Sequence, residues 1–290
     1  MSPTRQTIWL TGLALALFLG LRRLPDTHCA LLHADHQPVV ADGLEFCGVN
    51  EEANFYRPRD LKFPYALKVD LLGVGSARMG RLVLADEDGR PLLDYQLALT
   101  HTRKLHLHLR SLAQPGYAHL HPVAREDGGW TFELPVGFDF SAGAHAYVDF
   151  APVRNGRVVL AEAILPPHPG SLPLPEPVGG PLVVANFTQS AQHPAQSALL
   201  RLRLRRADGV PLKLRPLMGT LGHAVLVSAD TAESAMGYAH LHPSLEGGEY
   251  DLEPTLSFRL RLPKVGAYDL WLHVDDGVDR YLRVPVIVTP

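Results

Sequence analysis

Histidines recur in this chain at spacings that suit a metal ion. The segment His119-Leu120-His121-Pro122 returns as His240-Leu241-His242-Pro243, inside a heptapeptide that is identical in both places. An upstream run adds His106 and His108 to the first copy and His223 to the second. Imidazole nitrogens are common ligands of zinc and copper, and the ring must be neutral to bind. The repeat therefore predicts two histidine-based metal sites.

The spacing also predicts how strands would position these rings. On a β-strand, residues two apart point to the same face, so His106 and His108 share one side, as do His119 and His121. An antiparallel hairpin that pairs His106 with His121 also pairs His108 with His119. Opposed Cβ atoms lie about 4.5–5.5 Å apart, which lets two imidazoles reach one ion. A slip of one residue would place the rings on opposite faces.

The second copy predicts the same geometry with one histidine fewer. Pairing His223 with His242 places Val225 opposite His240. The expected metal ligands, with the two flanking thioethers of the second copy, are His223, His240, His242, His106, His108, His119, His121, Met218 and Met236. A thioether beside imidazoles favours copper, particularly Cu(I), and zinc is the alternative. In the structural alternative, the histidines only pair with backbone carbonyls or stack on neighbouring tyrosines.

Two other features predict a location outside the cytoplasm. An apolar run from Ile8 to Leu21 is flanked by arginines, and as a helix it would extend only about 21 Å against a hydrocarbon core of about 30 Å. Residues 1–24 are therefore expected to be an export signal or a short membrane anchor, with a buried helix as the alternative. The rest of the chain would then be periplasmic or otherwise extracytoplasmic. There, Cys29 and Cys47 are expected to form a disulfide, with a cysteine and histidine metal site or free thiols as alternatives.

The remaining pattern predicts an all-β chain with an internal duplication. Short runs such as 65–71 and 146–150 alternate with turns rich in Gly, Pro and Asp, and they recur in the second half. We expect two tandem immunoglobulin-like or cupredoxin-like β-sandwiches. The expected boundaries are a tether over 25–60, sandwiches over 61–165 and 182–290, and a proline-rich linker over 166–181.

Composition and motifs exclude several classes of function. A formal net charge of −3 with interspersed charges offers no basic surface for nucleic acid. The sequence contains no nucleophile elbow, no His-Glu-x-x-His and no phosphate-binding glycine loop, so an enzyme is not expected. The expected partners are a metal ion and, beyond it, another exported or membrane protein.

The second half carries a recognisable order of motifs. It contains a Gly-His strand start at Gly222-His223, a Ser-x-Asp turn at 228–230, the His-x-His-Pro element at 240–243, and closing strands at 268–271 and 284–288. In these motifs it resembles bacterial secreted β-sandwich domains related to YtkA-like domains, which often occur beside copper-handling or heavy-metal-binding modules. The resemblance covers most of 182–290 and implies a β-sandwich fold and export. The first half lacks the Ser-x-Asp turn.

Two functions follow from these patterns. The leading prediction is an exported metal-binding protein, with copper as the metal, that acts as a buffer, carrier or sensor. The alternative is a non-catalytic immunoglobulin-like interaction or scaffold module whose histidines are structural.

Overall fold

The computed structural model describes residues 2–21, 39–41, 44–46, 52–72, 79–113, 116–134, 138–154, 156–167, 182–232, 237–247 and 252–290. The predictions for Cys29, Cys47 and Met236, and most of the predicted linker, lie outside the described residues. The chain divides into two units, residues 1–34 and residues 35–290.

The N-terminal unit contains one helix, α1 (Pro3–Leu21). Its large apolar side chains, Ile8, Trp9 and Leu13 among them, are more than half exposed to solvent. Within the described part of the chain, no helix has both the length and the apolar character needed to span a membrane.

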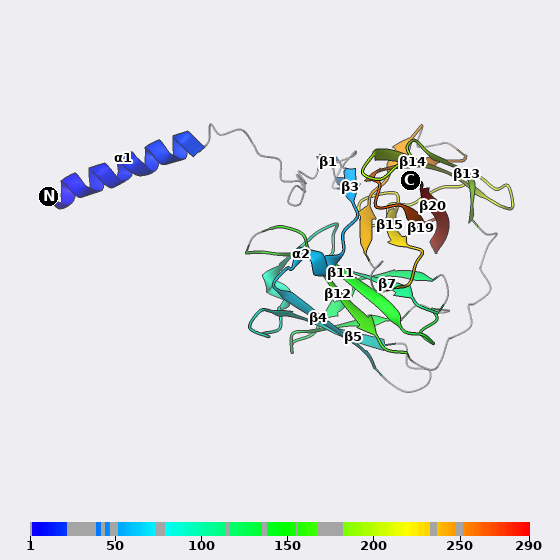
Figure 1. The fold of residues 1–290 in the computed structure, drawn as a ribbon, viewed down its shortest axis with the longest axis horizontal. Helices are drawn as coiled ribbons and strands as arrows, with labels where there is room; N and C mark the ends of the chain where they lie inside the picture. Colours follow the sequence, from blue (N-terminus) through cyan, green and yellow to red (C-terminus); the bar gives the residue numbers. More distant parts are fainter. Residues whose placement is uncertain are drawn as a thin grey trace. The chain divides into compact units, whose positions relative to one another are not determined.

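Nearly all regular elements in the described residues of the second unit are β-strands (Figure 1), which confirms the prediction of an all-β chain. The exceptions in its described residues are α2 (Pro58–Leu61) and the 3-10 turn η1 (Asp94–Gln96). Pro58 fixes a backbone angle that suits the first turn of a helix. Ahead of residue 61 lie β1 (Val39–Ala41), β2 (Leu44–Phe46) and β3 (Glu52–Asn54).

Residues 61–165, here called the first half, form two sheets with strand orders β4-β5-β10-β9 and β12-β11-β7-β8, and β6 pairs with β11. The strands are β4 (Tyr65–Leu72), β5 (Met79–Asp86), β6 (Leu97–Ala98), β7 (Leu105–Ser111), β8 (Tyr117–Leu120), β9 (Val123–Ala124), β10 (Gly129–Glu133), β11 (Ala144–Pro152) and β12 (Val159–Leu165). Alternate side chains of both sheets meet in one apolar cluster, to which Leu82, Trp130, Leu107 and Val148 belong.

Residues 182–290, the second half, repeat this plan. The sheets have strand orders β13-β14-β18-β17 and β16-β15-β19-β20. The strands are β13 (Leu182–Gln189), β14 (Ser197–Arg206), β15 (His223–Ser228), β16 (Tyr238–Leu241), β17 (Ser244–Glu246), β18 (Thr255–Arg261), β19 (Gly266–Asp275) and β20 (Asp279–Val288). Strand β3, from the segment expected to be a tether, adds to this half by pairing parallel to β18.

The two halves pack against each other through their histidine-bearing sheets. In β7, Leu105, Leu107 and Leu109 enter the core of the first half, while His106 and His108 occupy the other face and are also buried. A third apolar cluster covers that face with residues of both halves, namely Tyr117, Tyr147, Val225, Val227, Tyr238 and Trp271. Burial on both faces explains why every residue of β7, β11 and β15 is buried.

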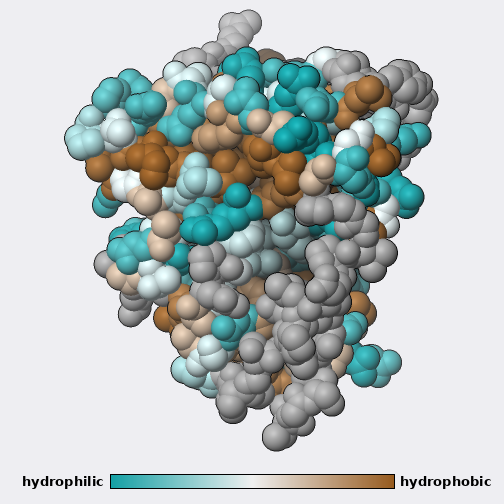
Figure 2. All heavy atoms as spheres, turned by 90° about the vertical axis from the view of Figure 1, so that its right-hand side faces the viewer, coloured by the Kyte–Doolittle hydropathy of each residue, from teal (hydrophilic) through white to brown (hydrophobic). Residues whose placement is uncertain are grey.

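The outer surface is mixed in polarity. Figure 2 shows one face on which a band of apolar side chains lies among hydrophilic ones. Large side chains that remain exposed include Leu99, Val123 and Val210. Such exposure is ordinary in folded proteins, whereas buried histidines are the informative exception.

Contact between the halves can be tested at Tyr147. This side chain is 1% exposed, and its hydroxyl oxygen accepts a 3.0 Å hydrogen bond from the backbone N–H of Gly237 in the other half. We expect Tyr147→Phe to lower the free energy of unfolding by about 1–3 kcal/mol, because the Gly237 N–H would stay buried without an acceptor. Thermal unfolding measures this. The matched control is Tyr95→Phe, at a tyrosine that is 72% exposed. Equal melting temperatures for the two variants would contradict the described packing.

Candidate metal centre

The strand registers bring the predicted histidines together. In the first hairpin, His108 pairs with His119 and Leu107 with Leu120. In the second, Val225 pairs with His240 and Ala224 with Leu241. Both registers are those predicted from the spacing. His121 and His242 directly follow β8 and β16. The ring centroid of His121 lies 5.2 Å from that of His106, and the ring centroid of His242 lies 5.0 Å from that of His223.

The first trio consists of His106, His119 and His121. Each ring offers one nitrogen, and these three nitrogens lie within 4.8 Å of one another. His106 Nδ1 is 3.1 Å from His119 Nε2. The other nitrogen of His106, Nε2, donates a 2.9 Å hydrogen bond to the carbonyl of Thr100. That bond places the proton on Nε2 and leaves a lone pair on Nδ1.

The second trio consists of His223, His240 and His242, whose offered nitrogens also lie within 4.8 Å of one another. His223 Nδ1 is 3.3 Å from His240 Nε2. His223 Nε2 donates a 3.1 Å hydrogen bond to the carbonyl of Leu217. The lone pair of His223 therefore lies on Nδ1, directed at His240.

A buried carboxylate from the first half holds the second trio. Asp149 Oδ2 accepts a 2.8 Å hydrogen bond from His240 Nδ1, and Asp149 Oδ1 accepts a 3.1 Å bond from His108 Nε2. The Tyr117 hydroxyl completes this chain by donating to His108 Nδ1 at 2.8 Å. Burial alone would raise the pKa of Asp149, but the adjacent His240 and these hydrogen bonds hold that pKa well below its usual range.

These bonds leave two lone pairs facing each other. His240 donates its Nδ1 proton to a carboxylate, and His223 donates its Nε2 proton to a carbonyl, so in the neutral rings His240 Nε2 and His223 Nδ1 are both acceptors. At 3.3 Å the two nitrogens either share a proton or hold a metal ion between them. Two nitrogens at about 2.0–2.1 Å from a tetrahedral metal ion would themselves be roughly 3.3 Å apart. The spacing fits a bound metal ion.

Burial favours the neutral form of five histidines of the centre, namely His106, His108, His119, His121 and His223. It lowers the pKa of His108 to about 4, against the opposing effect of Asp149, and lowers that of His121 to about 3. Burial also holds the pKa values of His119 and His223 well below the ordinary value, and repulsion from neighbouring histidines adds to this. Neutral imidazole is the form that binds a metal ion, so the rings are ready as ligands at neutral pH.

The structure distributes the predicted ligands unevenly. Six of the histidines form the two trios. His108 stays apart from the first trio because both of its ring nitrogens already have hydrogen-bond partners, although it forms a third candidate group with Asp149 and His240. Met218 lies in the turn before β15. The centre also contains one carboxylate, that of Asp149, which was not among the predicted ligands.

Two residues of the centre were not predicted. Asp149 lies on β11, far along the sequence from both hairpins, and only sheet pairing with β7 brings it to the histidines. His101 lies in a turn ahead of β7, and its ring centroid is 4.2 Å from that of His242 in the other half. A residue-by-residue alignment of the two copies pairs His101 with Met218. Because Met218 was predicted as a metal ligand, this alignment would also have indicated His101.

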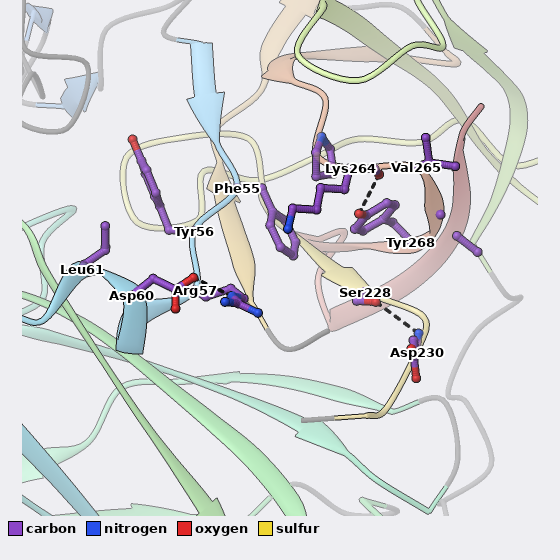
Figure 3. Close-up of a pocket in the computed structure, with 13 residues that line it drawn as sticks. Phe55, Tyr56, Arg57, Asp60, Leu61, Ser228, Asp230, Lys264, Val265 and Tyr268 are labelled. Atoms are coloured by element: carbon purple, nitrogen blue, oxygen red, sulfur yellow. Dashed lines mark hydrogen bonds and ion pairs between the residues drawn. The ribbon is translucent and has the colours of Figure 1, made fainter. Parts of the chain in front are cut away.

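A pocket of about 550 Å³ lies apart from the histidines (Figure 3). Arg57 and Asp60 form an ion pair on one side of it, and Ser228 and Asp230 lie on the other. The Ser228 hydroxyl oxygen accepts a 3.2 Å hydrogen bond from the backbone N–H of Asp230. Arg110 of the first half donates to the carbonyl oxygen of Asp230 at 3.2 Å. The Ser-x-Asp motif therefore shapes a turn that contacts the first half, and it is not part of the metal centre.

Comparisons with known proteins leave the activity open. The model of a domain of unknown function, DUF8832, matches residues 181–289, which is less than half of the chain. No curated protein matches the sequence.

Solved structures resemble the chain only distantly. A crystal structure of dimeric latent PorU from Porphyromonas gingivalis has 11% identity and a TM-score of 0.26, over 78% of this chain and 24% of that one. A tetra-tandem repeat of a large adhesion protein has 12% identity and a TM-score of 0.22, over 77% and 48%. Domains 1–6 of the surface layer protein SbsC have 13% identity and a TM-score of 0.19, over 82% and 28%. The chain thus spans less than half the length of each of these structures.

The lowered pKa values predict acid-sensitive folding. In the unfolded chain histidine titrates near 6.5, whereas folded His108 and His121 stay neutral down to about pH 4 and 3. Below pH 6.5 the unfolded state therefore binds more protons, and stability falls as the pH falls. Between pH 7.5 and pH 5, each of the two residues should cost about 2 kcal/mol.

Urea unfolding of the metal-free protein at the two pH values measures this loss. His121→Asn should reduce the pH-dependent loss by roughly the share of one histidine. His193→Asn, at an exposed histidine, should leave the loss unchanged. A stability that is flat between the two pH values would show that the trios are not buried as neutral rings.

Proposed function

We propose that this protein binds metal ions at its two histidine trios, with copper as the metal. The observation that carries this proposal is the convergence of three ring nitrogens within 4.8 Å in each trio, with His223 Nδ1 only 3.3 Å from His240 Nε2. A shared proton would also relieve their repulsion, but it bridges only two nitrogens. Each trio offers three nitrogens, and three imidazoles are a ligand set for a metal ion.

The ligand chemistry favours copper over hard cations. Imidazole suits copper and zinc, whereas magnesium and calcium require several oxygen ligands. Copper(II) binds such sites more tightly than the other divalent first-row ions, and a thioether nearby adds preference for Cu(I). Zinc remains the alternative metal.

Burial favours retention of the metal over rapid transfer. His106 and His223 have no exposed surface, and His119 is 3% exposed. An ion held there must leave past the partly exposed rings of His121 and His242. We therefore favour a copper buffer or sensor over a carrier. A non-catalytic role is part of this proposal.

The proposed setting is extracytoplasmic. The short apolar segment of α1 would act as an export signal or anchor, and the resemblance of the second half to secreted domains related to YtkA-like domains agrees with this. We also propose that the two halves are tandem sandwiches of the immunoglobulin-like or cupredoxin-like kind, because each has two sheets around one apolar cluster.

Metal content tests the proposal directly. Full-length protein purified without chelator should bind two copper ions. His242→Ala should weaken binding at the second trio by at least about tenfold, because one of its three nitrogen ligands is lost. The matched control is His193→Ala, at an exposed histidine that hydrogen-bonds only near the C-terminus. Equal copper affinity in both variants would favour the scaffold function.

Asp149 provides a second test of the same observation. Asp149→Asn removes the charge that holds the proton on His240 Nδ1, so copper affinity at the second trio should fall by about 10–100-fold. Calorimetric titration with copper measures this, and circular dichroism verifies the fold. Unchanged affinity in a folded variant would mean that this carboxylate does not orient a ligand.

A further inference from the structure

The halves meet in matched pairs of contacts. The strand registers make His106 equivalent to His223, His119 to His240, Tyr117 to Tyr238, and Tyr147 to Trp271. Exchanging the halves turns several of the ring contacts between them into others that are also present. By ring centroids, the matched pairs are His119–His223 at 5.5 Å with His106–His240 at 5.9 Å, and Tyr117–Trp271 at 5.9 Å with Tyr147–Tyr238 at 4.6 Å. The interface therefore has approximate twofold symmetry.

The turns that precede the two histidine strands are also equivalent. Thr100 and Arg103 exchange backbone hydrogen bonds, and so do Leu217 and Thr220. In each turn the carbonyl of the first residue accepts the Nε2 proton of the histidine six positions later. The second residue of each turn, His101 or Met218, has a positive φ, of 49° or 52°. His101 and Met218 thus occupy the same position in the two copies.

His101 reaches across the interface to the second trio. Its ring centroid lies 4.2 Å from that of His242 and 6.0 Å from those of both His223 and His240. The backbone of His101 belongs to the first half, while all three members of the trio belong to the second.

We propose that each trio receives a fourth ligand from the turn of the other half. His101 supplies a fourth imidazole to the second trio. By the twofold relation, Met218 supplies a thioether to the first trio, next to His121. This inference rests on the proposed metal-binding function and deepens it, because it assigns the ligands that complete each site and makes both sites depend on the docking of the halves.

The completed sites would differ in their metal preference. The first would have three imidazoles and a thioether, a soft set that suits Cu(I). The second would have four imidazoles, one of them held by Asp149, which suits Cu(II) or zinc. The twofold counterpart of Asp149 is His273, so the first trio has no such carboxylate, and His119 Nδ1 has no hydrogen-bond partner. The protein would thus hold one site for each oxidation state of copper.

X-ray absorption tests the assignment of Met218. Full-length protein with Cys29→Ser and Cys47→Ser, which removes the competing thiols, is loaded with one equivalent of Cu(I). The copper spectrum should contain one sulfur neighbour, and Met218→Leu should abolish it and weaken Cu(I) binding by at least about tenfold. The matched control is Met79→Leu on β5, at a methionine that is 40% exposed.

The companion variant is His101→Asn, which keeps a residue that tolerates positive φ. It should lower the affinity for Cu(II) or zinc at the second trio by at least about tenfold and leave Cu(I) binding unchanged. A Cu(I) spectrum without sulfur, or a sulfur signal that survives Met218→Leu, would overturn the inference while metal binding stands. Failure of the parent protein to bind copper or zinc at all would overturn the proposed function itself. The parent spectrum decides the question even if a variant fails to fold.

Discussion

Burial of polar rings between two apolar cores is the constraint on which this structure depends. The histidine face of each central sheet is turned away from its own core, where a single domain would leave it in water. Packing the two faces together removes that water, so every ring nitrogen needs a partner within the protein or an ion. Carbonyls, one carboxylate and a tyrosine hydroxyl satisfy part of this demand. Three ring nitrogens of each trio converge to within 4.8 Å of one another.

Duplication of one hairpin produces both halves of this arrangement. One hairpin with histidines at alternate positions gives a trio on one face, and a second copy gives a matching trio for it to meet. The two copies then differ at positions next to the trios, where a change of side chain alters the hydrogen bonds of a ligand ring. Asp149 and His273 occupy equivalent positions on β11 and β19, yet Asp149 accepts a hydrogen bond from the facing ring of His240. In contrast, His119 Nδ1 and His273 Nδ1 have no hydrogen-bond partner among the described residues. A pair of sites that share a backbone plan therefore differ in electrostatics.

The aromatic cluster around the centre supports it in two ways. Tyr117, Tyr147, Tyr238 and Trp271 exclude water from the rings, which strengthens each hydrogen bond within the centre. They also connect the halves, since Tyr147 accepts a hydrogen bond from Gly237 across the interface. The same contacts would serve a purely structural interface, so the convergence of three ring nitrogens in each trio, and not the packing, carries the argument for a metal ion.

The sequence by itself indicated the all-β character and the repeat, and alternation with period two placed the histidines of each hairpin on one face. The registers predicted from the spacing agree with the structure, although a slip of two residues would have kept the same faces. The sequence also indicated all six histidines of the two trios, together with His108. Only the tertiary structure decided that the trios face each other, that Asp149 and His101 join them, and that His108 stays outside. These contacts join positions far apart in the chain, such as Asp149 and His240, and depend on how two sheets dock. Local periodicity reports which face a residue occupies, but it does not report what that face packs against.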